Sequence, residues 1–193
     1  MVKQRSSSKQ RLIDAAFEHF FIHGYEGASL STIAEVVGIR KASIYTHFAS
    51  KEALFRNLLQ DAVEIESEYL QRCFIYNQSK YPGEHYLKHL QQRYQESITL
   101  RFLIRVAYVP PVTLVEMVST SYLQYIQVAQ SLFEQQFCQL FANKNQEIIQ
   151  RYTDAYLGIL DSLSVELLYA GDHYSRRLSA MLMLYMISID NIY

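Results

Sequence analysis

The sequence predicts an all-α protein, in which an N-terminal three-helix head with a helix-turn-helix is joined to a helical C-terminal body. Only 6 Gly and 3 Pro occur in 193 residues, so few residues interrupt long helices. Apolar side chains recur at helical spacing, and no segment shows strand alternation of any length. Half of the residues are hydrophobic, which is enough to bury a sizeable core.

The head begins with a helix predicted over residues 8–23. Leu12, Ala16 and Phe20 recur at helical spacing along one apolar face. Gly24 follows, and a glycine with positive φ is a common helix terminator. We therefore expect the first helix to end there.

Two short helices are predicted next, over residues 31–37 and 41–48. Ser29 is a plausible N-cap for the first of them. Gly38 permits a tight turn between the two. Two short helices joined through a glycine have the layout of a helix-turn-helix.

A long helix is then predicted after Ser50, which caps it, with Glu52 in the first turn facing the positive end of the helix dipole. It runs to about Tyr76, and Pro82 is placed to open the next helix after a loop. Pro110 and Pro111 enforce a later break. The body helices beyond the loop are predicted over residues 85–95, 97–108, 112–142, 147–169 and 172–193, the last two separated by Gly171.

Charge is distributed unevenly along the chain. Residues 1–60 carry eight basic and five acidic side chains, a net of +3, whereas the remainder carries ten basic and fourteen acidic, a net of −4. A basic head on an acidic body suits a protein whose one end meets a polyanion.

Several classes of protein are disfavoured. No stretch reaches the roughly 18 uninterrupted apolar residues of a membrane span, and the polar N-terminus has no apolar signal region. The cysteines match no metal spacing. Two histidine pairs at i,i+4 spacing lack a third ligand, so neither metal nor cofactor is expected. A cytoplasmic protein without a membrane partner is the simplest interpretation.

The second short helix has a distinctive outward face. Ile44 and Phe48 lie four residues apart and anchor it to the core. Lys41, Ala42, Tyr45 and Thr46 then share an arc of roughly 140° on the other side. This small, polar face fits a DNA major groove, which admits a helix.

These residues also carry a family resemblance. The run GYEGASLSTIAEVVGI followed by IYTHFASKEALF resembles the N-terminal domain of the TetR (tetracycline-repressor) family over residues 9–59. The mutual spacing of Tyr45, His47, Phe48 and Lys51 is specific to that family. The resemblance implies a DNA-binding domain over residues 1–50, a ligand-binding and dimerisation domain over residues 51–193, and a transcriptional repressor that is not an enzyme.

The resemblance also assigns DNA contacts. The residues that match the recognition helix of the family are Lys41, Ala42, Ser43, Tyr45 and Thr46. Ser29 and Ser31 match positions that often contact a phosphate or a base. His47 and Lys51 match positions that contact the DNA backbone. Alternatively, His47 packs beside Phe48 and does not contact DNA. The basic arm, Lys3, Arg5, Lys9 and Arg11, either adds contacts or is an ordinary solvated tail.

The last two predicted helices are apolar around much of their circumference, so each must be covered from more than one side. In the TetR family the matching helices pair with a second subunit; one thick intrachain core is the alternative. A homodimer has two-fold symmetry and implies a near-palindromic site on double-stranded DNA.

The body is rich in aromatic side chains with polar tips, which are typical of the wall of a small-molecule cavity. The candidate ligand-binding residues are Phe102, Tyr108, Met117, Tyr122, Tyr125, Phe133, Phe137, Tyr152 and Tyr156. A small hydrophobic or amphipathic inducer would suit such a wall. Two alternatives stay open: a DNA-binding regulator controlled by a protein partner without an inducer, and, less supported, a helical enzyme, for which no nucleophile–base motif is present.

Overall fold

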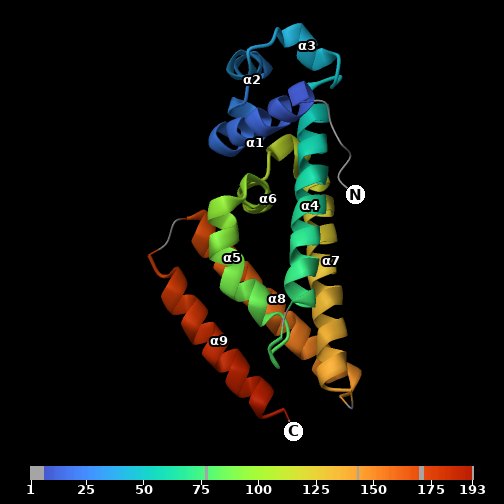
Figure 1. Cartoon of the computed structure of the whole chain (residues 1–193), viewed down its shortest axis with the longest axis vertical. Helices are drawn as coiled ribbons and strands as arrows, with labels where there is room; N and C mark the ends of the chain where they lie inside the picture. Colours follow the sequence, from blue (N-terminus) through green and yellow to red (C-terminus); the bar gives the residue numbers. More distant parts are fainter. Residues whose placement is uncertain (1–6, 77, 143, 170–171, 193) are drawn as a thin grey trace. The chain divides into compact units, whose positions relative to one another are not determined.

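The computed structural model describes residues 7–76, 78–142, 144–169 and 172–192, and over these ranges the chain is all-α, as predicted (Figure 1). The described residues form nine α-helices and one 3-10 helix and contain no strand. They divide into two compact units. Unit 1 comprises the described residues up to Glu64 together with Ile98–Tyr122, and unit 2 comprises those of Ile65–Ser97 and from Leu123 onward.

Unit 1 is built around one amphipathic helix and a small aromatic core. Its elements are α1 (Ser7–Gly27), α2 (Leu30–Val37), α3 (Lys41–Tyr45), the first part of α4 (Lys51–Ile75), α6 (Ile98–Tyr108), η1 (Val112–Leu114) and the start of α7 (Val115–Leu140). Helix α1 packs against α2 on one side and α6 on the other (Figure 1). The rings of Phe17 and Phe55 both meet Phe102 edge-on, at 5.3 and 5.5 Å between centroids.

Unit 2 is a helical bundle. It contains the end of α4, α5 (Glu84–Glu96), most of α7, α8 (Gln146–Leu168) and α9 (Tyr174–Asp190). Helix α9 packs against α5 and α8. Its interior is filled by large side chains, and Tyr86, Phe133, Phe137 and Tyr156 are all almost completely buried.

Three predicted helix caps and ends in the head are confirmed. Ser29 occupies the N-cap of α2, and Gly38 ends that helix with a φ of 75°, donating its N–H to the carbonyls of Ala34 and Glu35. Ser50 caps α4, because its Oγ accepts the Ala53 N–H at 3.0 Å.

Three boundaries in unit 1 differ from the prediction. Gly24 has the expected positive φ of 68°, but one more turn follows it, so α1 is kinked at Gly24 and ends at Gly27. Helix α3 ends at Tyr45 and is followed by a turn, not a helix to residue 48. The segment after Pro111 begins as the 3-10 helix η1 before α7 starts at Val115.

Helix α5 spans Glu84–Glu96, within one residue of the predicted 85–95, but Pro82 does not open it. Gly83 occupies its N-cap with a left-handed φ of 70°, so the helix starts at Glu84. The Gly83 N–H donates to Gln136 Oε1 at 2.8 Å, and that tertiary bond fixes the corner. Gly171 and the first residues of the predicted loops, 77 and 143, lie outside the described residues. The predicted division into a DNA-binding domain (residues 1–50) and a ligand-binding and dimerisation domain (residues 51–193) is a division by function, and it stays a prediction.

Within the described ranges, no single helix is long and apolar enough to cross a membrane. One bent pair, Ile98–Tyr108 with Val112–Leu140, meets the length and composition limits when its two parts are taken together.

Candidate nucleic-acid interface

Helix α3 presents one exposed face and buries the other. Ile44 is 0% exposed and Phe48, three residues beyond the helix, is 6% exposed, so these two side chains hold the segment on the core of unit 1. Lys41, Ala42 and Tyr45 are exposed, and half of the Tyr45 surface is open to solvent. The exposure agrees with the predicted outward face, whose contact with DNA stays a prediction.

The turn after α3 continues this exposed surface. Thr46 and His47 are both exposed, whereas Ser43 is half-buried. The Thr46 hydroxyl donates to the Ser43 carbonyl at 2.8 Å, which leaves its oxygen lone pairs free to accept a further bond. Because His47 is exposed, its imidazole is open to solvent, and its contact with a phosphate stays a prediction.

The start of α2 is fixed by a contact that the sequence pattern does not reveal. The backbone N–H of Ser29 donates to Nε2 of His19 at 3.1 Å. The Ser29 side chain makes no capping bond and is half-buried, while Ser31 is exposed. Burial, and secondarily the neighbouring His23, lowers the pKa of His19, which favours the neutral imidazole that this acceptor role needs.

Lys51 sits at the first position of α4, as predicted, but its ammonium is already engaged. Nζ donates to the carbonyl oxygens of Tyr25 at 2.7 Å and Ala28 at 3.2 Å. It also lies over the Tyr25 ring, 4.4 Å from the centroid. The sequence contains no local signal for these bonds, because Tyr25 and Lys51 are 26 residues apart.

The basic arm is only partly described. Lys3 and Arg5 lie outside the described residues. Lys9 lies over the Phe48 ring, with Nζ 5.3 Å from the centroid, and Arg11 is exposed on α1. Lys9, one residue of the predicted arm, therefore contacts Phe48, the buried residue that holds the segment after α3 on the core.

The nine candidate ligand-binding residues fall into both units. Phe102, Tyr108, Met117 and Tyr122 belong to unit 1, where Phe102 fills the core beside Phe17 and Phe55. The other five belong to unit 2, and four of them pack on one another: Phe133 stacks on Tyr156 at 4.6 Å, and Phe137 lies 5.2 Å from Tyr152.

The hydroxyls of unit 2 are mostly paired inside the protein. Tyr86 and Tyr125 share a hydrogen bond of 2.5 Å, and Tyr156 donates to the Gly83 carbonyl at 3.3 Å. Burial raises the pKa of the Tyr125 phenol far above its ordinary value, so the pair stays neutral. Among the predicted wall residues, Tyr152 also lines an apolar groove of about 270 Å³ between α8 and α9.

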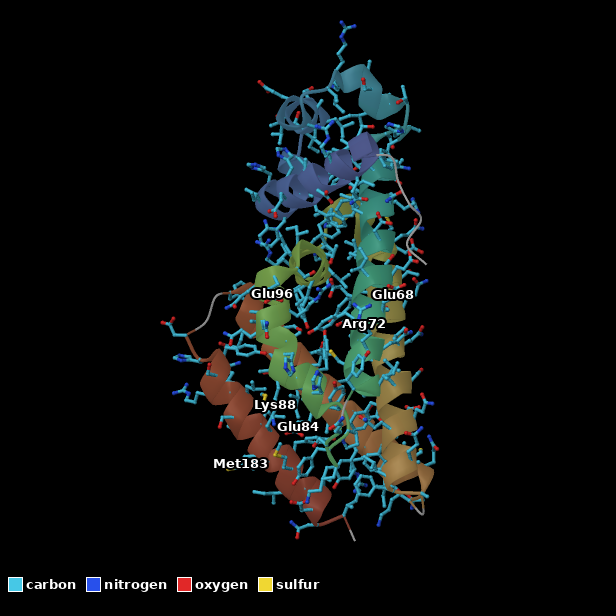
Figure 2. All side chains as sticks on the ribbon, viewed as in Figure 1. Glu68, Arg72, Glu84, Lys88, Glu96 and Met183 are labelled. Carbon is cyan, nitrogen blue, oxygen red and sulfur yellow. The ribbon has the colours of Figure 1, made fainter. Side chains whose placement is uncertain are left out.

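A buried polar cluster in unit 2 escaped the sequence analysis. Glu66 of α4 is 1% exposed and accepts hydrogen bonds from Arg93 of α5 and from the hydroxyl of Ser97. The Arg93 guanidinium also lies 4.4 Å from the centre of the Tyr69 ring. Figure 2 labels two neighbours on α4, Glu68 and Arg72, which are less deeply placed than Glu66. The described residues contain no group of three or more His, Cys, Asp or Glu side chains suited to a metal.

Comparison with known proteins identifies the head. Residues 12–58 match the family model described as "Bacterial regulatory proteins, tetR family". This segment contains α2, α3 and the turn that leads into α4. The matched segment is a TetR-family domain.

Relatives of this TetR-family domain include the protein described as "Biofilm operon icaADBC HTH-type negative transcriptional regulator IcaR" of Staphylococcus aureus (strain Newman), 38% identical over 72 residues, which are 37% of each chain. The Staphylococcus epidermidis protein of the same description is 34% identical over 64 residues, 33% of this chain and 35% of the relative. The chain thus matches about a third of the length of these curated relatives.

Solved structures share the fold of this chain over nearly its whole length. A TerR/AcrR-family regulator from Aquifex aeolicus VF5 has a TM-score of 0.69 at 22% identity, covering 94% of this chain and 99% of that one. The fatty acid degradation regulator FadR from Bacillus halodurans has a TM-score of 0.73 at 15% identity, covering 98% of both. FadR from Bacillus subtilis, in complex with stearoyl-CoA, has a TM-score of 0.66 at 16% identity, covering 96% and 100%.

Proposed function

We propose that the chain is a sequence-specific DNA-binding transcriptional repressor that acts as a homodimer on a near-palindromic site. The observation that carries this proposal is the exposed face of α3, which is held on the core from behind by Ile44 and Phe48. Lys41, Ala42, Tyr45, Thr46 and His47 on that surface, together with Ser43, Ser29 and Ser31, are the proposed DNA-contacting set. The relationship of the head to a negative transcriptional regulator supports repression.

The chemistry of this surface suits the major groove. A groove about 12 Å wide admits a helix, and its base edges offer acceptors to an ammonium and to hydroxyls. Lys41 and Thr46 supply these groups from exposed positions. Because residues 1–60 carry a net charge of +3, they also attract phosphate groups, which positions the protein without reading the sequence.

The homodimer is supported by an apolar surface on unit 2. Met183 (labelled in Figure 2), Leu184 and Ile187 of α9 are each more than half exposed. The groove between α8 and α9 is lined by Ile159, Met181 and Leu184 as well as by Tyr152 and Tyr185. Exposed apolar side chains concentrated on adjacent helices mark an interaction surface, and pairing of identical surfaces gives two-fold symmetry.

We also propose that a small hydrophobic or amphipathic ligand releases the protein from DNA. Unit 2 has an aromatic interior with a few hydroxyls, the composition expected of such a site. A chain of the same fold, FadR from Bacillus subtilis, is solved in complex with stearoyl-CoA. The ligand must bind the DNA-incompetent conformation more tightly, because equal affinity for both conformations shifts nothing.

A second candidate is a DNA-binding regulator that has no inducer and is controlled by a protein partner. The observation that favours it is the close packing around Phe133, whose ring centroid lies 4.6 Å from that of Tyr156 and 5.9 Å from that of Phe137. A ligand entering there must displace packed rings from one another.

The decisive experiment selects genomic DNA fragments with the purified protein and measures affinity for the recovered sequence at several salt concentrations. We expect a near-palindromic sequence and a log–log slope on the order of −5 to −10. Recovery of unrelated fragments, or binding that salt does not weaken, would refute the proposal. Titration with long-chain acyl-CoA and fatty acids then tests release: loss of affinity by about 5- to 150-fold supports an inducer, and no loss favours the second candidate.

A further inference from the structure

The ammonium of Lys51 is positioned by the protein itself. An ammonium has three N–H donors, and two of them go to the carbonyls of Tyr25 and Ala28, at 2.7 and 3.2 Å. The Tyr25 ring covers it as well, 4.4 Å from Nζ to the ring centroid. Lys51 therefore binds both ends of a four-residue segment of its own chain.

That segment is the connection between α1 and α2. Because α1 is kinked at Gly24, the turn that follows ends at Gly27, and terminal carbonyls of a helix lack partners within the helix. A cation is favoured at such an end by the helix dipole. Lys51 satisfies both conditions from the first position of α4.

The connection determines where the helix-turn-helix begins. Ala28 is buried, and Ser29, the N-cap of α2, follows it directly. On the other side, the Ser29 N–H is held by Nε2 of His19. Since α2 packs against α3, a shift of this connection moves the exposed face of α3 relative to α4.

We propose that Lys51 is a positioning residue: it acts on DNA binding by holding the Tyr25–Ala28 connection and not by contacting a phosphate. The proposal rests on the proposed DNA-binding function but concerns how one residue serves it. Two of the three N–H donors are committed to charge-assisted hydrogen bonds, which are about twice as strong as neutral ones, so at most one donor is left for a phosphate.

The test compares Lys51→Met, Lys51→Arg and the control Arg56→Met in the full-length protein. Arg56 is an exposed cation on the same helix, paired only with Glu52 among the ion pairs of the described residues. Three measurements are made: the melting temperature without DNA, amide hydrogen exchange over residues 25–33, and the salt dependence of affinity for a selected DNA site.

For Lys51→Met we expect the melting temperature to fall by about 5 °C, with faster exchange over residues 25–33. Affinity for DNA falls at least about tenfold, while the slope of log affinity against log salt stays within about 0.5 of wild type. Lys51→Arg keeps the charge but not the compact ammonium, so it does not restore stability or exchange. Arg56→Met leaves stability and exchange unchanged.

The opposite pattern overturns the proposal. A slope less negative by about 1.8 for the dimer, or full rescue of affinity by Lys51→Arg, would make Lys51 a phosphate contact. Unchanged stability and exchange in Lys51→Met would equally refute positioning. If wild-type protein binds no DNA, the proposed function fails, and the stability and exchange measurements still decide whether Lys51 holds the connection.

Discussion

The carboxylate of Glu66 accepts two hydrogen bonds from the guanidinium of Arg93, at 2.9 Å from Nε and 2.8 Å from Nη2. Ser97 adds a third at 2.7 Å. The pair joins α4 to α5 inside unit 2, where Glu66 has almost no contact with solvent. Such a carboxylate is compatible with the folded state only while its partners are in place.

Removal of Arg93 should therefore be strongly destabilising. In Arg93→Met the buried Glu66 carboxylate loses its counter-charge, and we expect the free energy of unfolding to fall by about 3 kcal/mol. Urea denaturation measures this directly. Arg151→Met is the matched control, since its pair with Glu147 is exposed and contributes less than about 1 kcal/mol. Equal losses in the two variants would contradict the assignment.

Gly83 and Gly38 both have positive φ but differ in their surroundings. A Cβ on Gly83 would overlap the Tyr156 ring, whereas nothing lies within 4 Å of a Cβ on Gly38. Gly38→Ala should cost about 1 kcal/mol from backbone strain alone, and Gly83→Ala should cost at least about 2 kcal/mol more because the ring must move. Thermal and urea unfolding of the two variants test the difference; similar costs would show that the Gly83 corner can adjust.

Alkaline pH should destabilise the protein through its buried tyrosines. Burial raises the pKa of Tyr174 from 10.0 to about 12. Stability from this group is present below pH 10 and is lost as the pH rises toward 12, because the unfolded chain ionises first. Each pH unit in that window costs up to about 1.4 kcal/mol per group. In Tyr174→Phe the decline between pH 8 and pH 11 should be shallower than in wild type. Parallel declines in the two proteins would contradict burial of this phenol.

A charge on the apolar surface of α9 should prevent dimerisation. Leu184 is 63% exposed and lines the groove between α8 and α9, so Leu184→Asp would place a carboxylate in the proposed interface. We expect a monomer by sedimentation equilibrium and weaker binding to a palindromic site. Val112→Asp, an exposed position in unit 1, is the control and should remain a dimer. A dimeric Leu184→Asp would place the interface elsewhere.

Lys41 should contribute sequence preference as well as affinity. Loss of its exposed ammonium in Lys41→Ala removes a donor to a base edge, at a cost of about 1–3 kcal/mol at the affected base pair. Selection of binding sites from a random pool, repeated with Arg56→Ala, measures the change. Only the Lys41 variant should alter the selected sequence; a uniform loss across all sequences would assign Lys41 to the phosphate backbone.

The features that the sequence predicts well are local ones. Gly38, Ile44 and Phe48 lie within eleven residues, so helical spacing and a turn residue are enough to indicate the helix-turn-helix and its buried side. Spacing identifies which side of a helix is buried but not what it packs against. Glu66 and Arg93 are 27 residues apart in the chain, and their pairing depends on the crossing of two helices. Phe102 illustrates the same limit: the sequence offers it as a wall residue of a ligand cavity and does not reveal its contacts with Phe17 and Phe55.

The discontinuity of unit 1 has a consequence for protein engineering. Its core takes Phe17 and Phe55 from the N-terminal segment and Phe102 from α6, which follows the whole of α5 in the chain. A chimera that transplants only the first 64 residues onto another effector domain would lack the Phe102 ring. The apolar side chains that pack on this ring, Phe17 and Phe55, would then be exposed to water. Graft designs based on this chain should import α6 with the head, or supply an aromatic side chain of equal volume at that point.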